Sequence, residues 1–164
     1  MTADPGKRSH RKPADARTHR SREPDKQGYQ ARAAAVKMLA AVVEQKTPID
    51  EEHGNPAFRA LSPADRALVR AILNSALRHL NWTNAIFDRF LDKPLPDGAR
   101  HLRHILSVAA AQILFLNIPD HSAVDIAVEQ ARHDPRTSRF SNLVNALLRR
   151  LGREKDDILG DVGS

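Results

Sequence analysis

The sequence predicts an all-α protein, a bundle of about six or seven helices preceded by a disordered basic N-terminal tail. No segment of the 164 residues alternates apolar and polar side chains as a half-buried strand would. Apolar residues recur instead at three- and four-residue spacing in successive segments. Residues 105–118 carry no charge, which is typical of a helix surrounded by other helices. Because a membrane span needs ~20 such residues, we expect a buried central helix and no membrane partner.

Residues 1–28 form the predicted tail. They contain no Val, Ile, Leu, Phe, Trp or Tyr, so they cannot bury enough apolar surface to offset the entropy of ordering. Their eight Lys/Arg outnumber four Asp/Glu. We interpret the segment as a basic arm that folds onto RNA or DNA, with a solvated tail or inter-domain leader as the alternative. The expected RNA contacts are Arg8, Arg11, Lys12, Arg17, Arg20 and Arg22.

The first half of the domain is expected to hold three helices. Residues 29–45 are rich in strong helix formers. Residues 47–61 are predicted to form a loop, with a short turn that packs Phe58 and Leu61 against the core. Ser62, Pro63 and Asp65 together are a helix start signal, which predicts a helix to Leu80. Asn81 is expected to cap a further helix, which Pro94 and Pro96 end.

The second half is expected to hold the central helix and two more. Asp97 is the predicted cap of the central helix, which runs to about Asn117. A capping-box-like pair, Ser122 and Asp125, predicts the next helix, to about His133. Thr137 or Ser138 opens the last one, to Leu151. We therefore expect an ordered domain over residues 29–155, with 156–164 as a flexible C-terminal end or the start of a linker.

The last predicted helix has an apolar side and an arginine side. At ~100° per residue, its polar residues fall on one arc, opposite Phe140, Val144, Leu147, Leu148 and Leu151. Arginine forks suit phosphate oxygens, and each neutralised phosphate releases counterions. The alternative is a solvated polar face. The predicted RNA contacts of the folded domain are Arg139, Asn142, Arg149, Arg150 and Arg153, with Arg32 and Lys37 of the first helix as further contacts.

No residue pattern points to catalysis, to a cofactor or to a metal. The chain has no cysteine, which excludes thiolate ligands and a cysteine nucleophile and fits a cytoplasmic protein. His101 and His104 share a helical face, but no third ligand accompanies them. We expect His121 to make a local hydrogen bond to the backbone, and Asn145 to hydrogen-bond the neighbouring corner, with an RNA contact as its alternative.

Several segments resemble the NusB family. Residues 32–39 (RAAAVKML), 122–132 (SAVDIAVEQAR) and 143–146 (LVNA) look like three of its helical motifs. Within that fold the sequence is more similar to the N-terminal domain of RsmB-type ribosomal RNA cytosine-5 methyltransferases. The segments that carry this similarity are 65–68 (DRAL), 77–78 (LR), 112–116 (QILFL), 118–124 (IPDHSAV) and 143–150 (LVNALLRR).

The resemblance implies an RNA-binding, non-catalytic helical domain that positions ribosomal RNA for a covalently linked methyltransferase domain. S-adenosylmethionine would be the methyl donor of that other domain, so no cofactor is expected on this chain. One alternative is an antitermination factor that binds nascent RNA with a ribosomal protein; here Leu143 stands where NusB itself usually has a phenylalanine that can stack on a base. The second alternative is a helical protein-interaction module.

Overall fold

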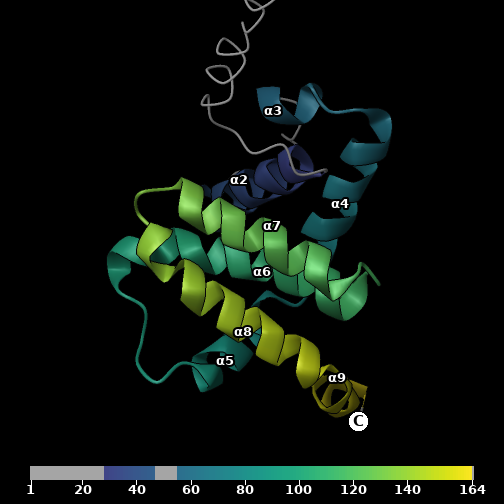
Figure 1. Ribbon diagram of the computed structural model, residues 1–164. Helices are drawn as coiled ribbons and strands as arrows, with labels where there is room; N and C mark the ends of the chain where they lie inside the picture. Colours follow the sequence, from purple (N-terminus) through teal and green to yellow (C-terminus); the bar gives the residue numbers. More distant parts are fainter. Residues whose placement is uncertain (1–27, 47–54, 164) are drawn as a thin grey trace, which may run out of the picture.

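The computed structural model describes residues 28–46 and 55–163, with side-chain detail to residue 160. The predicted arm, with Arg8, Arg11, Lys12, Arg17, Arg20 and Arg22, lies outside the described residues. Within them the chain is helical and has no strand, which confirms the predicted fold class (Figure 1). The α-helices are α2 (Tyr29–Gln45), α3 (Pro56–Arg59), α4 (Pro63–Arg78), α5 (Leu80–Phe90), α6 (Arg100–Phe115), α7 (Asp120–His133), α8 (Ser141–Arg153) and α9 (Lys155–Gly163).

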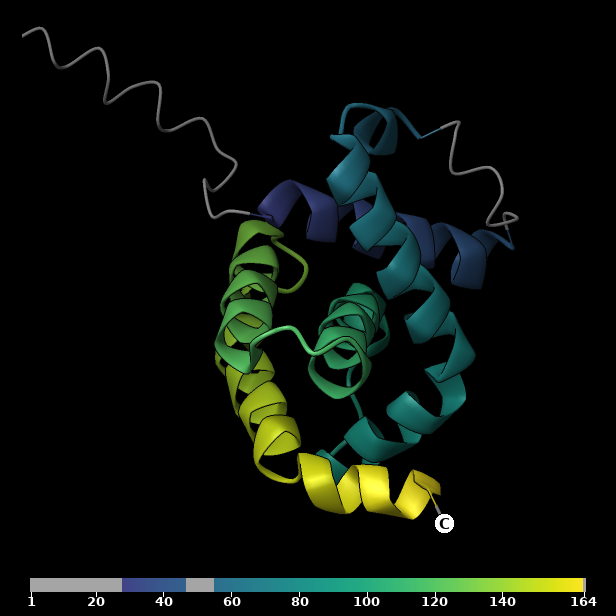
Figure 2. The same ribbon diagram turned by 90° about the vertical axis from the view of Figure 1, so that its right-hand side faces the viewer.

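Helix α6 is the centre of the bundle. Figure 2 looks nearly along it, with α2, α4, α5, α7 and α8 arranged around it, and each of these five helices packs against it. Every residue from His104 to Leu114 is buried. The central helix predicted from the uncharged stretch is therefore confirmed. Among the described residues, no helix is both long and apolar enough to cross a membrane.

Two predicted features of the first half are present. The Ser62 hydroxyl accepts a hydrogen bond from the Asp65 N–H at 3.1 Å, so Ser62 caps α4. In the preceding loop, the Asn55 side chain accepts from the Phe58 N–H at 3.1 Å and starts the single turn of α3. That turn buries Phe58, which is 1 % exposed. The loop thus docks one aromatic side chain on the core as predicted.

Several helix boundaries differ from the prediction. Helix α5 begins at Leu80, one residue before the predicted cap Asn81. Asp97 opens a 3₁₀ turn, η3 (Asp97–Ala99), and α6 follows without a capping side chain. Helix α7 begins at Asp120 rather than at Ser122. Pro119 is the residue just before it, its carbonyl accepts from the Ala123 N–H at 3.3 Å, and Asp120 places an acid in the first turn.

The C-terminal end also differs. Residues 156–164 are predicted to be flexible, whereas the structure has helix α9 there, directly after α8. Asp156 and Asp157 place acidic side chains in its first turn, and Ile158 is only 4 % exposed. Burial of this one side chain against the bundle is a tertiary effect, and so short an apolar pattern could not predict it.

Arg32 lies inside the bundle and not on its surface. Its side chain is 9 % exposed, and its Nε donates to Gln112 Oε1 of α6 at 3.0 Å. Gln112 Nε2 in turn donates to the Val108 carbonyl at 2.9 Å. Burial lowers the pKa of the Arg32 guanidinium, and the nearby Asp65 carboxylate opposes that shift. The prediction that Arg32 contacts RNA does not fit this position, because the guanidinium joins α2 to α6.

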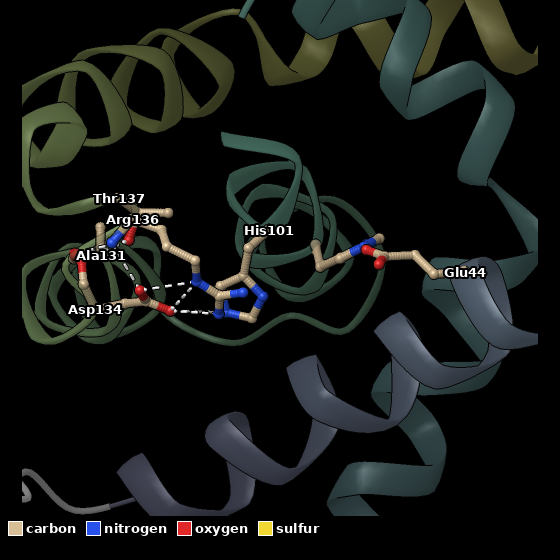
Figure 3. A network of polar contacts seen from close by, with 7 residues as sticks. Glu44, His101, Ala131, Asp134, Arg136 and Thr137 are labelled. Carbon is tan, nitrogen blue, oxygen red and sulfur yellow. Dashed lines mark hydrogen bonds and ion pairs between the residues drawn. The ribbon is translucent and has the colours of Figure 1, made fainter. Parts of the chain in front are cut away.

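A polar network joins the turn after α7 to the start of α6. Figure 3 shows the Asp134 carboxylate in contact with both Arg136 and His101. Arg136 Nη2 donates to Asp134 Oδ2 at 2.7 Å, and His101 Nε2 lies 3.8 Å from the same oxygen. Thr137 Oγ1 donates to the Ala131 carbonyl at 2.8 Å and closes the turn. The hydrogen bond from Arg136 lowers the pKa of Asp134 to about 2.

The two histidines on the shared face of α6 therefore have separate partners. His101 faces Asp134, whereas His104 is hydrogen-bonded to Glu44 of α2. Burial lowers the pKa of His101, which favours its neutral form. No group of three or more metal-ligating side chains occurs in the part of the chain that the structure describes.

We expect Gln112→Leu to destabilise the fold by ~1–3 kcal/mol, because it removes the acceptor of a buried charged donor. Urea unfolding measures the free-energy difference. Ser75→Ala is the matched control, since the Ser75 hydroxyl is also buried but has no partner among the described residues. A loss for Gln112→Leu no larger than that of the control would contradict the structural role of the Arg32–Gln112 hydrogen bond.

We also expect the stabilisation by Asp134 to depend on acid pH. Its pKa, about 2 in the fold, lies below the ordinary 3.8, so its contribution is complete above that ordinary value and is lost as the pH falls through about 2. Asp134→Asn should therefore lower the Tm at pH ~6, with the difference shrinking below pH ~4. Asp125→Asn, on the exposed side of α7, is the control. A Tm difference for Asp134→Asn that is independent of pH would argue against the ion pair.

Candidate nucleic-acid interface

Helix α8 has the predicted apolar side. Val144, Leu147, Leu148 and Leu151 are all buried, and the helix packs along α7 and against α6. Figure 1 shows α8 lying beside α7. The spacing of these side chains, three and four residues apart, places them on one face of the helix. The polar residues of α8 consequently lie on or near the surface.

The arginines of α8, which the sequence places on one arc of roughly 100°, have different surroundings. Arg149 and Arg153 are exposed and line one side of a hollow of about 650 Å³. Arg150 is half-buried on another side, where its guanidinium lies over the Phe90 ring of α5 at 4.0 Å from the centroid. Its Nε also donates to Glu154 Oε2 at 2.8 Å. A step of ~100° from Arg149 to Arg150 is thus enough to bring Arg150 against α5.

Two further predicted contacts lie where α8 begins. Arg139 belongs to a 3₁₀ turn, η4 (Ser138–Phe140). The ~100° step per residue of an α-helix therefore does not fix its direction relative to α8. It is exposed, with its guanidinium 4.7 Å from the centroid of the Phe140 ring. Asn142 is exposed in the first turn of α8. Lys37 is exposed on α2 and lines a different hollow.

The hollow beside Arg149 and Arg153 is completed by the start of α7. Asp120 and His121 form its opposite wall. The two helices approach closely there, since a Cβ on Gly152 would lie 2.7 Å from Asp120 Oδ2. Asp120 and His121 are site residues that the sequence prediction missed, because it placed the start of this helix at Ser122. The signal that could have found them is Asp120, because acidic residues are favoured in the first turn of a helix.

Asn145 holds one of these arginines in place. Arg149 Nε donates to Asn145 Oδ1 at 3.0 Å, one turn earlier on the same helix. The predicted hydrogen bond of Asn145 to the neighbouring corner is thus replaced by a bond within α8. The remaining guanidinium donors of Arg149, together with those of Arg153, face solvent at the hollow. Two guanidinium groups beside the positive end of the α7 dipole can bind phosphate groups, while the Asp120 carboxylate weakens the local positive potential.

The chain resembles known proteins over this helical region. The NusB family model matches residues 29–153. The ribosomal RNA small subunit methyltransferase B of Xanthomonas campestris pv. campestris is 35% identical over 127 residues, which are 77% of this chain and 29% of that protein. The protein of the same name from Vibrio vulnificus is 35% identical over 126 residues, 76% of this chain and 29% of its own length. The chain therefore spans less than a third of these relatives and matches their N-terminal, NusB-like part.

A solved structure shows the same architecture. T. maritima NusB superposes with a TM-score of 0.64 at 18% sequence identity, covering 84% of this chain and 99% of that chain. At so low an identity the likeness establishes the fold alone. Together with the family match over residues 29–153, it shows that this chain belongs to the NusB family.

Proposed function

We propose that this domain binds ribosomal RNA through the exposed arginines of α8 and positions that RNA for a methyltransferase domain of the same protein. The single observation that carries the proposal is the exposed pair Arg149 and Arg153 at one hollow, in a domain whose relatives are named ribosomal RNA methyltransferases. The pair is one helical turn apart, so both guanidinium groups can reach neighbouring phosphates of one strand.

The proposed interface has a core and an extension. Arg149 and Arg153 are its core, because neither has an ion pair among the described residues. Arg139 and Asn142 extend it toward the start of α8. Arg150 contributes less, since Glu154 neutralises its charge and Phe90 holds its guanidinium. The predicted arm, residues 1–28, would add the contacts of Arg8, Arg11, Lys12, Arg17, Arg20 and Arg22. Arg32 is left out because it is buried.

The proposed role is binding and not catalysis. The α8 hollow offers two guanidinium groups and an imidazole, which suit phosphate recognition, while the Asp120 carboxylate beside them opposes it. Methyl transfer is proposed for the part of the longer relatives that this chain does not match, and S-adenosylmethionine would bind there.

Recognition of a short single strand by stacking, as in an antitermination factor, is less well supported. Leu143 occupies the position where NusB itself usually has a phenylalanine, and it is half-buried against the core. Phe140, one turn away, is also half-buried and lies under the Arg139 guanidinium. Neither side chain offers an open aromatic face for a base, so phosphate contacts dominate the proposed interface.

We expect the double variant Arg149→Ala/Arg153→Ala to weaken binding to small-subunit ribosomal RNA fragments and to lower the salt dependence of binding. Loss of two phosphate contacts should reduce the slope of log K against log salt by about two. Fluorescence anisotropy with labelled RNA at ~50 and ~200 mM salt measures both quantities.

The matched control is Arg78→Ala/Arg89→Ala, which removes the same charge from exposed positions on α4 and α5. It should leave the slope within about half a unit of the unaltered protein. An equal loss in both double variants would mean that net charge, and not the α8 face, drives binding. Absence of RNA binding at low salt would refute the proposal and favour a protein partner.

A further inference from the structure

A second hollow lies at the opposite end of α7 from Arg149 and Arg153. It has a volume of about 360 Å³ and is enclosed by α2, the start of α6 and the end of α7. This volume is within the ~300–1,000 Å³ range of small-ligand pockets. Its lining includes Tyr29, Val36, Lys37, Gln130 and His133.

One lining residue, Gln130, has a side-chain amide without a hydrogen-bond partner among the described residues. The residue is only 8 % exposed, and its side chain makes no hydrogen bond within residues 28–46 and 55–163. Its amide atoms are also not among the polar atoms sealed away from any accessible space. The other fully enclosed glutamine, Gln112, is bonded to both Arg32 and Val108. The Gln130 amide lines the hollow and has no partner among the described residues, so its donor and acceptor are available to a ligand that enters there.

The walls of the hollow suit a flat, partly apolar ligand. Tyr29 and His133 have ring centroids 6.4 Å apart and planes at 72° to each other. Tyr29 is only 5 % exposed, so His133, held against it edge-to-face, offers the ring face on which a planar group can stack. Val36 adds an aliphatic surface beside them. His133 is exposed, so the aromatic wall can be reached from solvent.

The charges around the hollow are nearly balanced except for one lysine. Asp134 lines it, but Arg136 neutralises that carboxylate at 2.7 Å. His101 is buried enough to favour its neutral form. Lys37 is exposed at the rim, without an ion pair among the described residues. His101, His133 and Asp134 do not form a group that could hold a metal ion.

We propose that this hollow binds a single unstacked nucleobase, with the Gln130 amide reading its hydrogen-bonding edge and Lys37 contacting the attached phosphate. An amide presents one acceptor beside one donor, which matches the adjacent donor and acceptor on the edge of each base. Unpaired bases in RNA are commonly bound by ring stacking and by hydrogen bonds to their edges. The inference rests on the proposed RNA-binding function and names a second contact of the same RNA.

The connection from α7 to α8 links this hollow to the arginine face. Arg136 and Arg139 are exposed on that connection. A strand whose base occupies the hollow can therefore follow these side chains toward Asn142 at the start of α8. The same base could come from a free nucleotide, so the test compares both sources.

The first measurement is a titration of the four nucleoside 5′-monophosphates, followed by ¹⁵N chemical shifts. We expect at least one of them to shift the Gln130 side-chain amide and the backbone amides around Val36, with a Kd on the order of 1 mM. Gln130→Leu should weaken this binding about fivefold or more without a loss of stability, because the deleted amide has no partner in the fold. Lys37→Ala should weaken it too, whereas Lys93→Ala, an exposed lysine between α5 and η3, should not.

The second measurement repeats the RNA anisotropy with Gln130→Leu. We expect a loss of about fivefold with an unchanged salt slope, since an uncharged contact is removed. Nucleotide binding that survives Gln130→Leu, shifts confined to α8, or no shifts at all would overturn the nucleobase site. RNA binding that depends on Arg149 and Arg153 but not on Gln130 would overturn this inference and leave the proposed function intact. Nucleotide shifts at Gln130 without any RNA binding would assign the hollow to free nucleotides and refute the RNA proposal.

Discussion

The burial of α6 on all sides is the constraint on which the rest of the structure depends. Five helices pack on it, and no residue from His104 to Leu114 reaches the surface. Of the polar side chains in that stretch, Gln112 has an internal partner in Arg32, whereas the Ser107 hydroxyl has none among the described residues. The Arg32–Gln112 hydrogen bond fixes α2 against α6. Helix α7 packs on both α6 and α2, and residues of these three helices line the hollow around Gln130.

Local signals in the sequence were sufficient for the main elements of the fold. The absence of charge over residues 105–118 identified α6, and the Ser62 cap identified the start of α4. The position of Arg32 was harder to predict, because a cation in a basic protein suggests the surface. A signal was nevertheless present, since Arg32 precedes Val36 and Leu39 by four and seven residues and so shares their buried face. Periodicity carried more information about Arg32 than charge did.

The candidate sites were only partly predictable. Helical spacing placed Arg149 and Arg153 together, because their relation lies within one helix. It could not separate Arg150 from them, since that separation depends on Phe90 of α5. It also could not find Gln130 as a binding residue. In the sequence Gln130 is a polar residue beside Ala131, and only the packing of α2 across α7 encloses it.

The two hollows at the ends of α7 differ in the kind of recognition they offer. Helix α7 has 14 residues and is therefore ~20 Å long, so an RNA that contacts both ends must span several nucleotides. At the start of α7, Arg149 and Arg153 provide charge, which acts on any phosphate. At its end, Gln130 provides an uncharged amide, which acts only on a base held in one orientation. Affinity and selectivity would then arise at separate places on one helix. A change in salt would affect the first site strongly and the second very little.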